Sequence, residues 1–177
     1  LALVQRRGPA GGKRWGPLEL IYEEGGGAKV TIGNPCPVVE QSTGVLWLPF
    51  NRDNNQVLMT SSSDDGKTWT KPQDITATTK AKDWTWYATG PGNGIQLTRG
   101  SHKGRLVIPC DHAAGGAKPE DKGNWDKAGR SHVIYSDDHG RAWKLGGATD
   151  FSMNECAVVE LSDGTLMLNS RSYRGKA

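Results

Sequence analysis

A glutamate and an arginine near the end of the 177-residue sequence are the residue types best suited to carry chemistry. Glu155 lies eight residues before Asp163, and Arg171 lies eight residues after it. The segment reads as a hairpin turning at Asp163, so the two side chains should be cross-strand neighbours at the end away from the turn. A guanidinium suits bidentate recognition of a ligand carboxylate. An ordinary ion pair joining two strands is the alternative.

The position of Arg171 has polar counterparts upstream. Asn51 and Asp111 precede it at two successive intervals of 60 residues. Glu155 in turn stands where Pro35 stands 120 residues earlier. Copies that share a backbone role should share residue types, so these departures indicate local function. We expect Asn51, Asp111 and Arg171 to surround one opening, one from each repeat.

Two adjacent aromatic residues, Trp86 and Tyr87, come shortly before the glycine-rich stretch 90–94. Flat aromatic faces can stack on a sugar ring or wall an apolar pocket, and they can equally well pack between strands. The histidines lack the spacing of metal ligands, so we expect no metal site. None of the three cysteines lies in a Cys-x-x-Cys pair, and we expect buried free thiols.

The elements that must position these residues repeat along the chain. The segment from Asn34 to Leu48 matches the segment from Asn154 to Leu168 at Asn, Cys, Val, Val, Glu, Gly, Leu and Leu. Halfway between them, the segment from Gly104 to Pro109 matches the segment from Gly44 to Pro49. The three copies define a unit of about 60 residues.

A second repeat interleaves with the first. The pattern Ser-x-Asp-x-Gly-x-Thr-Trp at residues 62–69 recurs at residues 136–143 with Ala in place of Thr. Asp can accept backbone N–H groups, and Gly can take a positive φ, so each box predicts a tight turn between two strands. Each unit therefore reads as four short antiparallel strands, which is typical of a β-propeller blade. A β-solenoid is the alternative, but it calls for a shorter and more regular period.

Composition agrees with one all-β domain. The 24 glycines and nine prolines indicate many turns, and no apolar run is long enough to form a transmembrane segment. The net charge of +3 is too small to favour nucleic acid as a partner. We expect residues 1–177 to form a single incomplete propeller domain, about three blades of a six-bladed ring. The expected units are about 1–30, 34–90 and 94–150, with a further blade starting at 154–177.

The boxes and their surroundings resemble the exo-α-sialidase (neuraminidase) family. The resemblance extends from about Leu1 to Arg174. Two copies of the Ser-x-Asp-x-Gly-x-Thr-Trp pattern, at residues 62–69 and 136–143, resemble the family's Asp boxes. Further matching segments follow in the family's order along the chain, at residues 34–37, 90–92, 106–109, 154–156 and 168–172. It implies a six-bladed propeller that removes terminal sialic acid, and a partner that is a sialylated glycan on a glycoprotein, ganglioside or oligosaccharide.

The resemblance also implies roles for single residues. Glu155 matches the glutamate that polarises a tyrosine nucleophile, and Arg171 matches one of three arginines that bind the sialic acid carboxylate. Asp111 falls where the family contacts the glycerol tail, and Trp86 and Tyr87 fall near the N-acetyl pocket. Asn51 is a further candidate for substrate binding.

The implied reaction is retaining hydrolysis with a Tyr nucleophile, and it requires no metal or organic cofactor. The family's nucleophile, its acid and its other two arginines match positions outside these 177 residues, so we expect the isolated chain to be inactive. Transfer of the sugar to an acceptor other than water is a variant of this reading. A non-catalytic Asp-box propeller that binds glycans or proteins is the alternative.

Overall fold

The computed structural model describes residues 1–9, 11–114 and 125–174, and the chain is all-β. The described residues form fourteen strands and two helices of one turn each, neither of which is long enough to cross a membrane. In chain order the elements are β1 (Ala2–Gln5), β2 (Glu19–Glu23), β3 (Ile32–Gly33), β4 (Val38–Glu40), β5 (Val45–Arg52), β6 (Gln56–Ser62), β7 (Gln73–Asp74), α1 (Thr76–Thr79), β8 (Trp86–Thr89), β9 (Ile95–Gln96), β10 (Leu106–Ala113), α2 (Trp125–Ala128), β11 (Gly129–Ser136), β12 (Lys144–Ala148), β13 (Met153–Glu160) and β14 (Leu166–Ser172).

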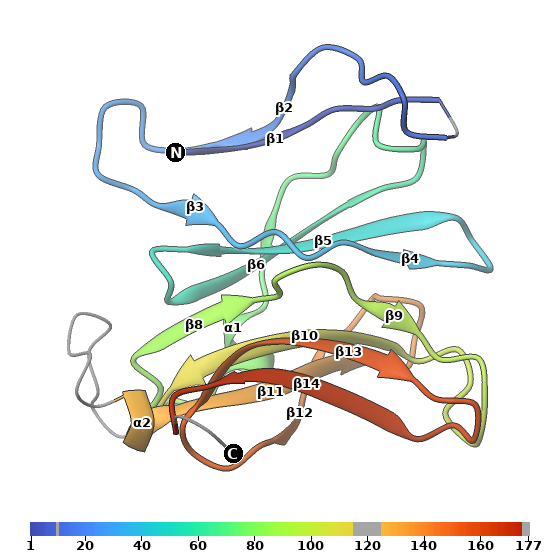
Figure 1. Ribbon diagram of the computed structural model, residues 1–177. Coiled ribbons are helices and arrows are strands. Elements are labelled where there is room, and N and C mark those ends of the chain that lie inside the picture. The colour runs from blue at the N-terminus through green and yellow to red at the C-terminus, as the bar shows by residue number, and fades with distance from the viewer. Residues whose placement is uncertain (10, 115–124, 175–177) are drawn as a thin grey trace.

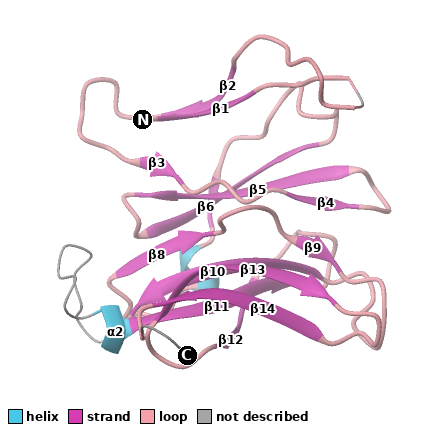
Figure 2. Ribbon diagram, in the orientation of Figure 1, coloured by secondary structure: helices cyan, strands magenta, loops and turns pink. Residues whose placement is uncertain are grey.

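The strands form antiparallel sheets stacked in layers (Figures 1 and 2). The hairpin β1–β2 lies at the top of the view, the sheet of β3 to β7 follows, and the sheet of β8 to β12 and the hairpin β13–β14 lie below. Each of the two larger sheets has four strand positions, because two short strands share one edge. In one sheet β3 and β4 both pair with β5, and in the other β8 and β9 both pair with β10. We call this shared edge position, and β13 in the last hairpin, the inner strand. The predicted propeller-like architecture, with four strands to a unit, is therefore confirmed.

The sheet boundaries differ from the predicted units at two strands, β8 and β3. The alignment of repeats places residues 86–89 in the unit 34–90, but β8 pairs with β10 of the following sheet. Similarly, β3 precedes the predicted start at residue 34 and pairs with the end of β5. The matched repeat begins at residue 34, which lies between β3 and β4. Matching of the repeats therefore locates each unit but assigns the short strand before this point to the wrong unit.

The inner strand is interrupted in two sheets and continuous in the third. Residues 34–37 separate β3 from β4, and residues 90–94 separate β8 from β9. Both interruptions contain proline, which has no N–H to donate to the ladder. Strand β13 continues through this position, where Glu155 replaces the Pro35 of the first sheet, although its ladder with β14 changes register between Met153 and Cys156. The repeat position that separates two strands elsewhere therefore lies at a local irregularity inside one strand here.

Apolar cores lie between successive layers. The largest core combines residues of both four-strand sheets: Cys36, Val38, Val57, Met59, Tyr87, Leu106, Ile108, Cys110, Ile134 and Trp143. A second core joins the upper hairpin to its neighbouring sheet through Leu3, Ile32, Phe50 and Leu58. A third joins β10 to the last hairpin through Val107 and Val158. Burial between layers, more than burial within one sheet, orients the strands.

Both Asp boxes form the predicted turns. In the first, Asp64 Oδ1 accepts hydrogen bonds from Ser62 Oγ at 2.8 Å and from Thr68 N at 2.9 Å. In the second, Asp138 Oδ1 accepts from Ser136 Oγ at 2.8 Å and from Ala142 N at 2.9 Å. A hydrogen bond from the Thr68 hydroxyl, together with these two bonds, holds the pKa of Asp64 well below its usual range, so the first box keeps its charge near neutral pH.

Two glutamates at equivalent repeat positions join neighbouring layers. Glu40 is fully buried and accepts hydrogen bonds from Gln96 Nε2 at 2.9 Å and from Thr43 N at 2.8 Å. Glu160 accepts hydrogen bonds from Thr98 N at 2.8 Å and from Arg99 N at 3.0 Å. Glu40 thus holds the end of β9, and Glu160 holds the segment that follows β9.

The glycine of the second Asp box provides a test of how the layers pack. Gly140 has a φ of +90°, and a Cβ added there would lie 2.2 Å from Trp47 of the neighbouring sheet. We expect Gly140→Ala to lower the free energy of unfolding by ~2 kcal/mol or more, through backbone strain and overpacking. Gly147→Ala is the control, since its Cβ would meet no atom within 4 Å. Equal chemical denaturation midpoints for both variants would contradict this packing.

Candidate active site

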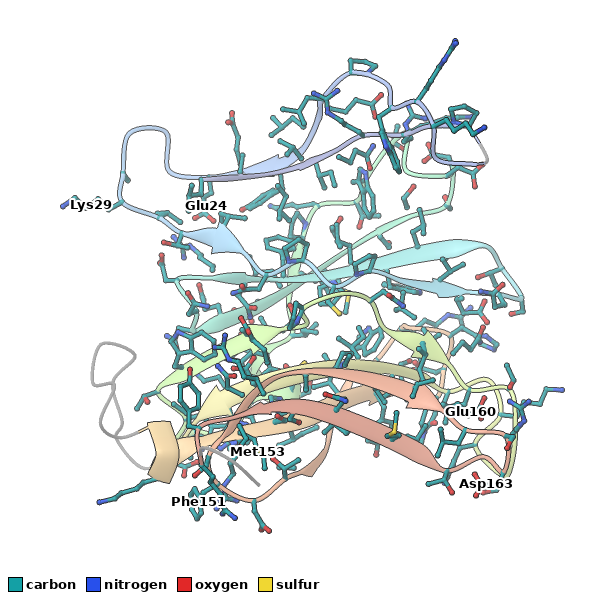
Figure 3. All side chains as sticks on the ribbon, in the orientation of Figure 1. Glu24, Lys29, Phe151, Met153, Glu160 and Asp163 are labelled. Carbon is teal, nitrogen blue, oxygen red and sulfur yellow. The ribbon has the colours of Figure 1, made fainter. Side chains whose placement is uncertain are left out.

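Glu155 and Arg171 meet across the hairpin β13–β14. Glu155 Oε2 lies 2.9 Å from Arg171 Nη1, and both side chains are about half exposed. The ladder changes register between Met153 and Cys156, which places the pair at the irregular end of the hairpin. Figure 3 shows Met153 at this end and Asp163 at the opposite, turn end. The predicted cross-strand contact is confirmed.

Two residues that sequence reasoning did not select hold Arg171. Its Nε donates to Asn154 Oδ1 at 2.9 Å, and its Nη2 donates to Tyr173 Oη at 3.1 Å. With the ion pair, these contacts use three of the five guanidinium N–H groups. The remaining two lie one on each terminal nitrogen, where a bidentate ligand could reach them. Asn154 matches Asn34 in the repeat, and a residue type shared between repeats indicates a role in the backbone and not a contact with Arg171.

A cavity of about 320 Å³ opens beside this pair. It collects residues from all three inner-strand positions, and its lining consists of Asn34, Pro35, Trp86, Ala88, Thr89, Gly90, Pro91, Gly92, Asp111 and Glu155. The two interruptions of the inner strands thus form its walls, and the uninterrupted β13 contributes its carboxylate. The cavity can therefore present a carboxylate and an aromatic ring to a small polar ligand, and the Arg171 guanidinium reaches its edge through the contact with Glu155.

Asp111 is the most unusual side chain of the cavity. It is fully buried, and neither carboxyl oxygen has a hydrogen-bond partner among the described residues. Burial, together with the charge of Glu155 and against the opposing charge of Arg171, raises the pKa of Asp111 to about 8. Asp111 is therefore mostly uncharged at pH 7, although the sequence gives no sign of this.

The two candidate aromatic residues, Trp86 and Tyr87, point to opposite faces of their sheet, because successive side chains of a strand alternate between its faces. Trp86 lines the cavity and packs near Ala113, its partner across the ladder. Tyr87 points to the other face, where it is fully buried in the largest core and meets His132 edge-on with ring centroids 4.9 Å apart. The structure thus brings Trp86, but not Tyr87, to the cavity.

Asn51 is not among the residues that line the cavity, but it forms a hydrogen bond with Thr89, which does line it. The residue is buried, and its Oδ1 accepts a hydrogen bond from Thr89 N at 2.9 Å. Thr89 lies in the cavity wall. Of the three residues expected around one opening, Asp111 lines the cavity, Arg171 pairs with Glu155 at its edge, and Asn51 supports the wall.

The three cysteines are free and buried, as predicted. Burial raises the pKa of the Cys36 and Cys156 thiols to about 12, so they are protonated and unreactive near neutral pH.

The rings of His112 and His132 share a buried contact of 3.0 Å between their Nδ1 atoms. No cluster suited to holding a metal ion occurs within residues 1–9, 11–114 and 125–174.

Comparison with known proteins agrees with this architecture. Residues 3–177 match the family described as "BNR repeat-like domain". The chain is 29% identical to a sialidase of Micromonospora viridifaciens over 96% of its own length and 32% identical to human Sialidase-4 over 98%. Its fold matches that of a Hadza microbial sialidase, Hz136, with a TM-score of 0.81 and 26% identity over 97% of the chain.

The chain belongs to the BNR repeat-like domain family, and its relatives identify it as part of a sialidase-type propeller. It spans 28% of the Micromonospora protein, 40% of the human one and 36% of the solved structure. The predicted fold class and family resemblance are confirmed.

Asp111 should make stability depend on pH in an unusual direction. Its pKa is raised in the folded chain, so the folded state holds this proton more tightly than the unfolded state, whose value is ~3.9. The stability contributed by this proton is therefore complete below pH ~4 and is lost as the pH rises to about 8. Asn cannot ionise, so the melting temperature of Asp111→Asn relative to the unmodified protein should rise by at least ~3 °C over this range.

Asp137→Asn is the matched control for this measurement. Asp137 pairs with Arg105 at 2.7 Å, which holds its pKa below the usual value. Its contribution therefore has the opposite sign, and the variant should gain no stability relative to the unmodified protein as the pH rises. A pH-independent difference for Asp111→Asn would contradict the assignment of a raised pKa.

Proposed function

We propose that the protein containing this chain hydrolyses terminal α-linked sialic acid from glycoconjugates. The observation that carries the proposal is the Glu155–Arg171 ion pair, 2.9 Å long, at the edge of a cavity that also contains Asp111. The substrate class is a sialylated glycoprotein, ganglioside or oligosaccharide. The relatives that span the chain are named sialidases, which supports this reading over that of an unrelated glycan-binding propeller.

Arg171 is the proposed binding group for the sugar carboxylate. Its two N–H groups not used by Glu155, Asn154 or Tyr173 can form the paired, charge-assisted hydrogen bonds that a carboxylate accepts best. About half of the side chain is exposed, so a ligand can reach it without opening the core. The contacts with Asn154 and Tyr173 fix the guanidinium in advance and reduce the conformational entropy lost on binding.

Glu155 is the proposed base for a tyrosine nucleophile from outside these 177 residues. A tyrosine hydroxyl has a reference pKa of ~10 and needs a base within hydrogen-bond reach to become nucleophilic. An uncharged tyrosine also avoids the repulsion that a carboxylate nucleophile would exert on an anionic sugar. Attack would give a retained configuration after two displacements, with the covalent intermediate on tyrosine and not on a carboxylate. The 177 residues alone should therefore be inactive.

Substitutions in the full-length protein test these roles. Glu155→Gln and Arg171→Ala should each lower kcat/KM for a fluorogenic α-sialoside by ~100-fold or more, through loss of a base and of charge stabilisation. Asp163→Asn is the matched control, because the amide oxygen can still accept the hydrogen bond from Thr165 N at the far end of the same hairpin.

Each outcome is informative. Loss of activity in both variants but not in the control supports the hydrolase and the roles of Glu155 and Arg171. Unchanged rates in both variants would contradict these roles, and no hydrolysis by the unmodified full-length protein would instead favour a non-catalytic propeller that binds glycans or proteins. Release of a sialylated acceptor in place of free sialic acid would identify a transferase that uses the same site.

A further inference from the structure

Two adjacent residues of β13 contact a single side chain of β14. Asn154 Oδ1 accepts a hydrogen bond from Arg171 Nε at 2.9 Å, and Glu155 Oε2 lies 2.9 Å from Arg171 Nη1. Successive side chains of a regular strand point to opposite faces of the sheet, so two neighbours in sequence do not normally share a partner on the next strand. The shared partner therefore indicates a local departure from regular strand geometry.

A β-bulge in β13 accounts for this shared partner. Met153 pairs with Ser172, and Cys156 pairs with Ser170. Two residues of β13 lie between these pairs, whereas Arg171 alone lies between them on β14. An arrangement of two residues opposite one redirects side chains and leaves the extra residue outside the regular ladder. The backbone of the bulge therefore needs support from outside the hairpin.

Ser131 of β11 provides this support from the neighbouring sheet. Its hydroxyl group donates a hydrogen bond of 2.6 Å to the backbone carbonyl oxygen of Asn154. Both residues are buried, so water does not compete for this carbonyl. The peptide unit that contains the carbonyl is planar and joins the Cα atoms of Asn154 and Glu155. One hydroxyl group thus orients the backbone from which both contacts with Arg171 arise.

Two further hydrogen bonds lie on either side of the bulge. Cys156 Sγ donates to the carbonyl oxygen of Cys110 at 3.2 Å and joins β13 to β10. The backbone N–H of Tyr173 donates to the carbonyl oxygen of Ser152 at 2.8 Å and closes the end of the hairpin. These two bonds fix the ends of the bulge, and the Ser131 hydroxyl fixes its middle.

We propose that Ser131 is a positioning residue for the candidate active site: it holds the β13 bulge that aligns Glu155 with Arg171. The inference deepens the proposed function and rests on it. Ser131 is not among the described residues that line the cavity, so it acts through the bulge and not by contact with the substrate. Because the base and the carboxylate-binding group must keep a fixed separation, a small shift of this backbone should impair both substrate binding and turnover.

Ser131→Ala in the full-length protein tests the inference. With the Asn154 carbonyl deprived of its donor, kcat/KM for a fluorogenic α-sialoside should fall ~10-fold or more, through both a lower kcat and a higher KM. Ser136→Ala is the matched control, because Ser136 is equally buried on the same strand and its hydroxyl accepts a hydrogen bond from Gly140 N at 2.8 Å. Its kcat/KM should change less than ~2-fold, although it also loses stability. Equal losses of kcat/KM in the two variants would overturn the inference.

A conservative variant and a double-mutant cycle separate positioning from general destabilisation. Ser131→Thr keeps the hydroxyl group, so its kcat/KM should stay within ~3-fold of the unmodified protein even if the extra methyl group lowers stability. Ser131→Ala should raise the inhibition constant of free sialic acid ~10-fold in the unmodified protein but less than ~2-fold in the Arg171→Ala background. The same factor in both backgrounds, or a Ser131→Thr variant as impaired as Ser131→Ala, would overturn the inference.

Failure of this inference can be distinguished from failure of the proposed function. If the unmodified protein hydrolyses no sialoside, the proposed function is wrong. A crystal structure of full-length Ser131→Ala still tests the positioning role without any measurement of activity. The peptide unit between Asn154 and Glu155 should be displaced and both contacts with Arg171 lengthened, and an unchanged bulge with both contacts intact would overturn the inference.

Discussion

The site depends on the burial of strand β10 on both faces. Every residue of β10 is buried, with alternate side chains directed into different layers. Leu106, Ile108 and Cys110 belong to the core between the two four-strand sheets, and Val107 packs toward the last hairpin. Asp111 follows on the same strand, so the packing that stabilises β10 also withdraws a carboxyl group from water. The raised pKa of Asp111 is thus a consequence of the fold's main apolar contacts.

The repeated motifs and the residues that depart from them serve different purposes. The Asp boxes and the equivalent Glu40 and Glu160 close turns or join layers, and their carboxylates are satisfied by N–H and O–H groups within the chain. Glu155 is different, because its carboxylate faces Arg171 at the edge of a cavity. The repeat therefore builds the scaffold, and the exceptions to it provide the chemistry.

The sequence was sufficient to predict the strand organisation and the contact between Glu155 and Arg171, since both follow from turn chemistry and counting along a hairpin. It could not predict which face of β8 is directed to the cavity, so it gave Trp86 and Tyr87 the same role. The packing of the sheets places Trp86 in the cavity wall and Tyr87 in the core. The sequence also could not predict that Asn51 acts on the wall through Thr89, or that Asn154 and Tyr173 hold Arg171. These contacts depend on how sheets pack together, which spacing within one strand does not determine.

A crystal structure of the full-length protein with bound sialic acid would test the account most directly. The account predicts that the sugar carboxylate lies within hydrogen-bond distance of the Arg171 guanidinium, ~2.7–2.9 Å, beside the cavity that Glu155 and Trp86 line. Sialic acid bound away from this cavity, or bound in it with its carboxylate remote from Arg171, would contradict the account.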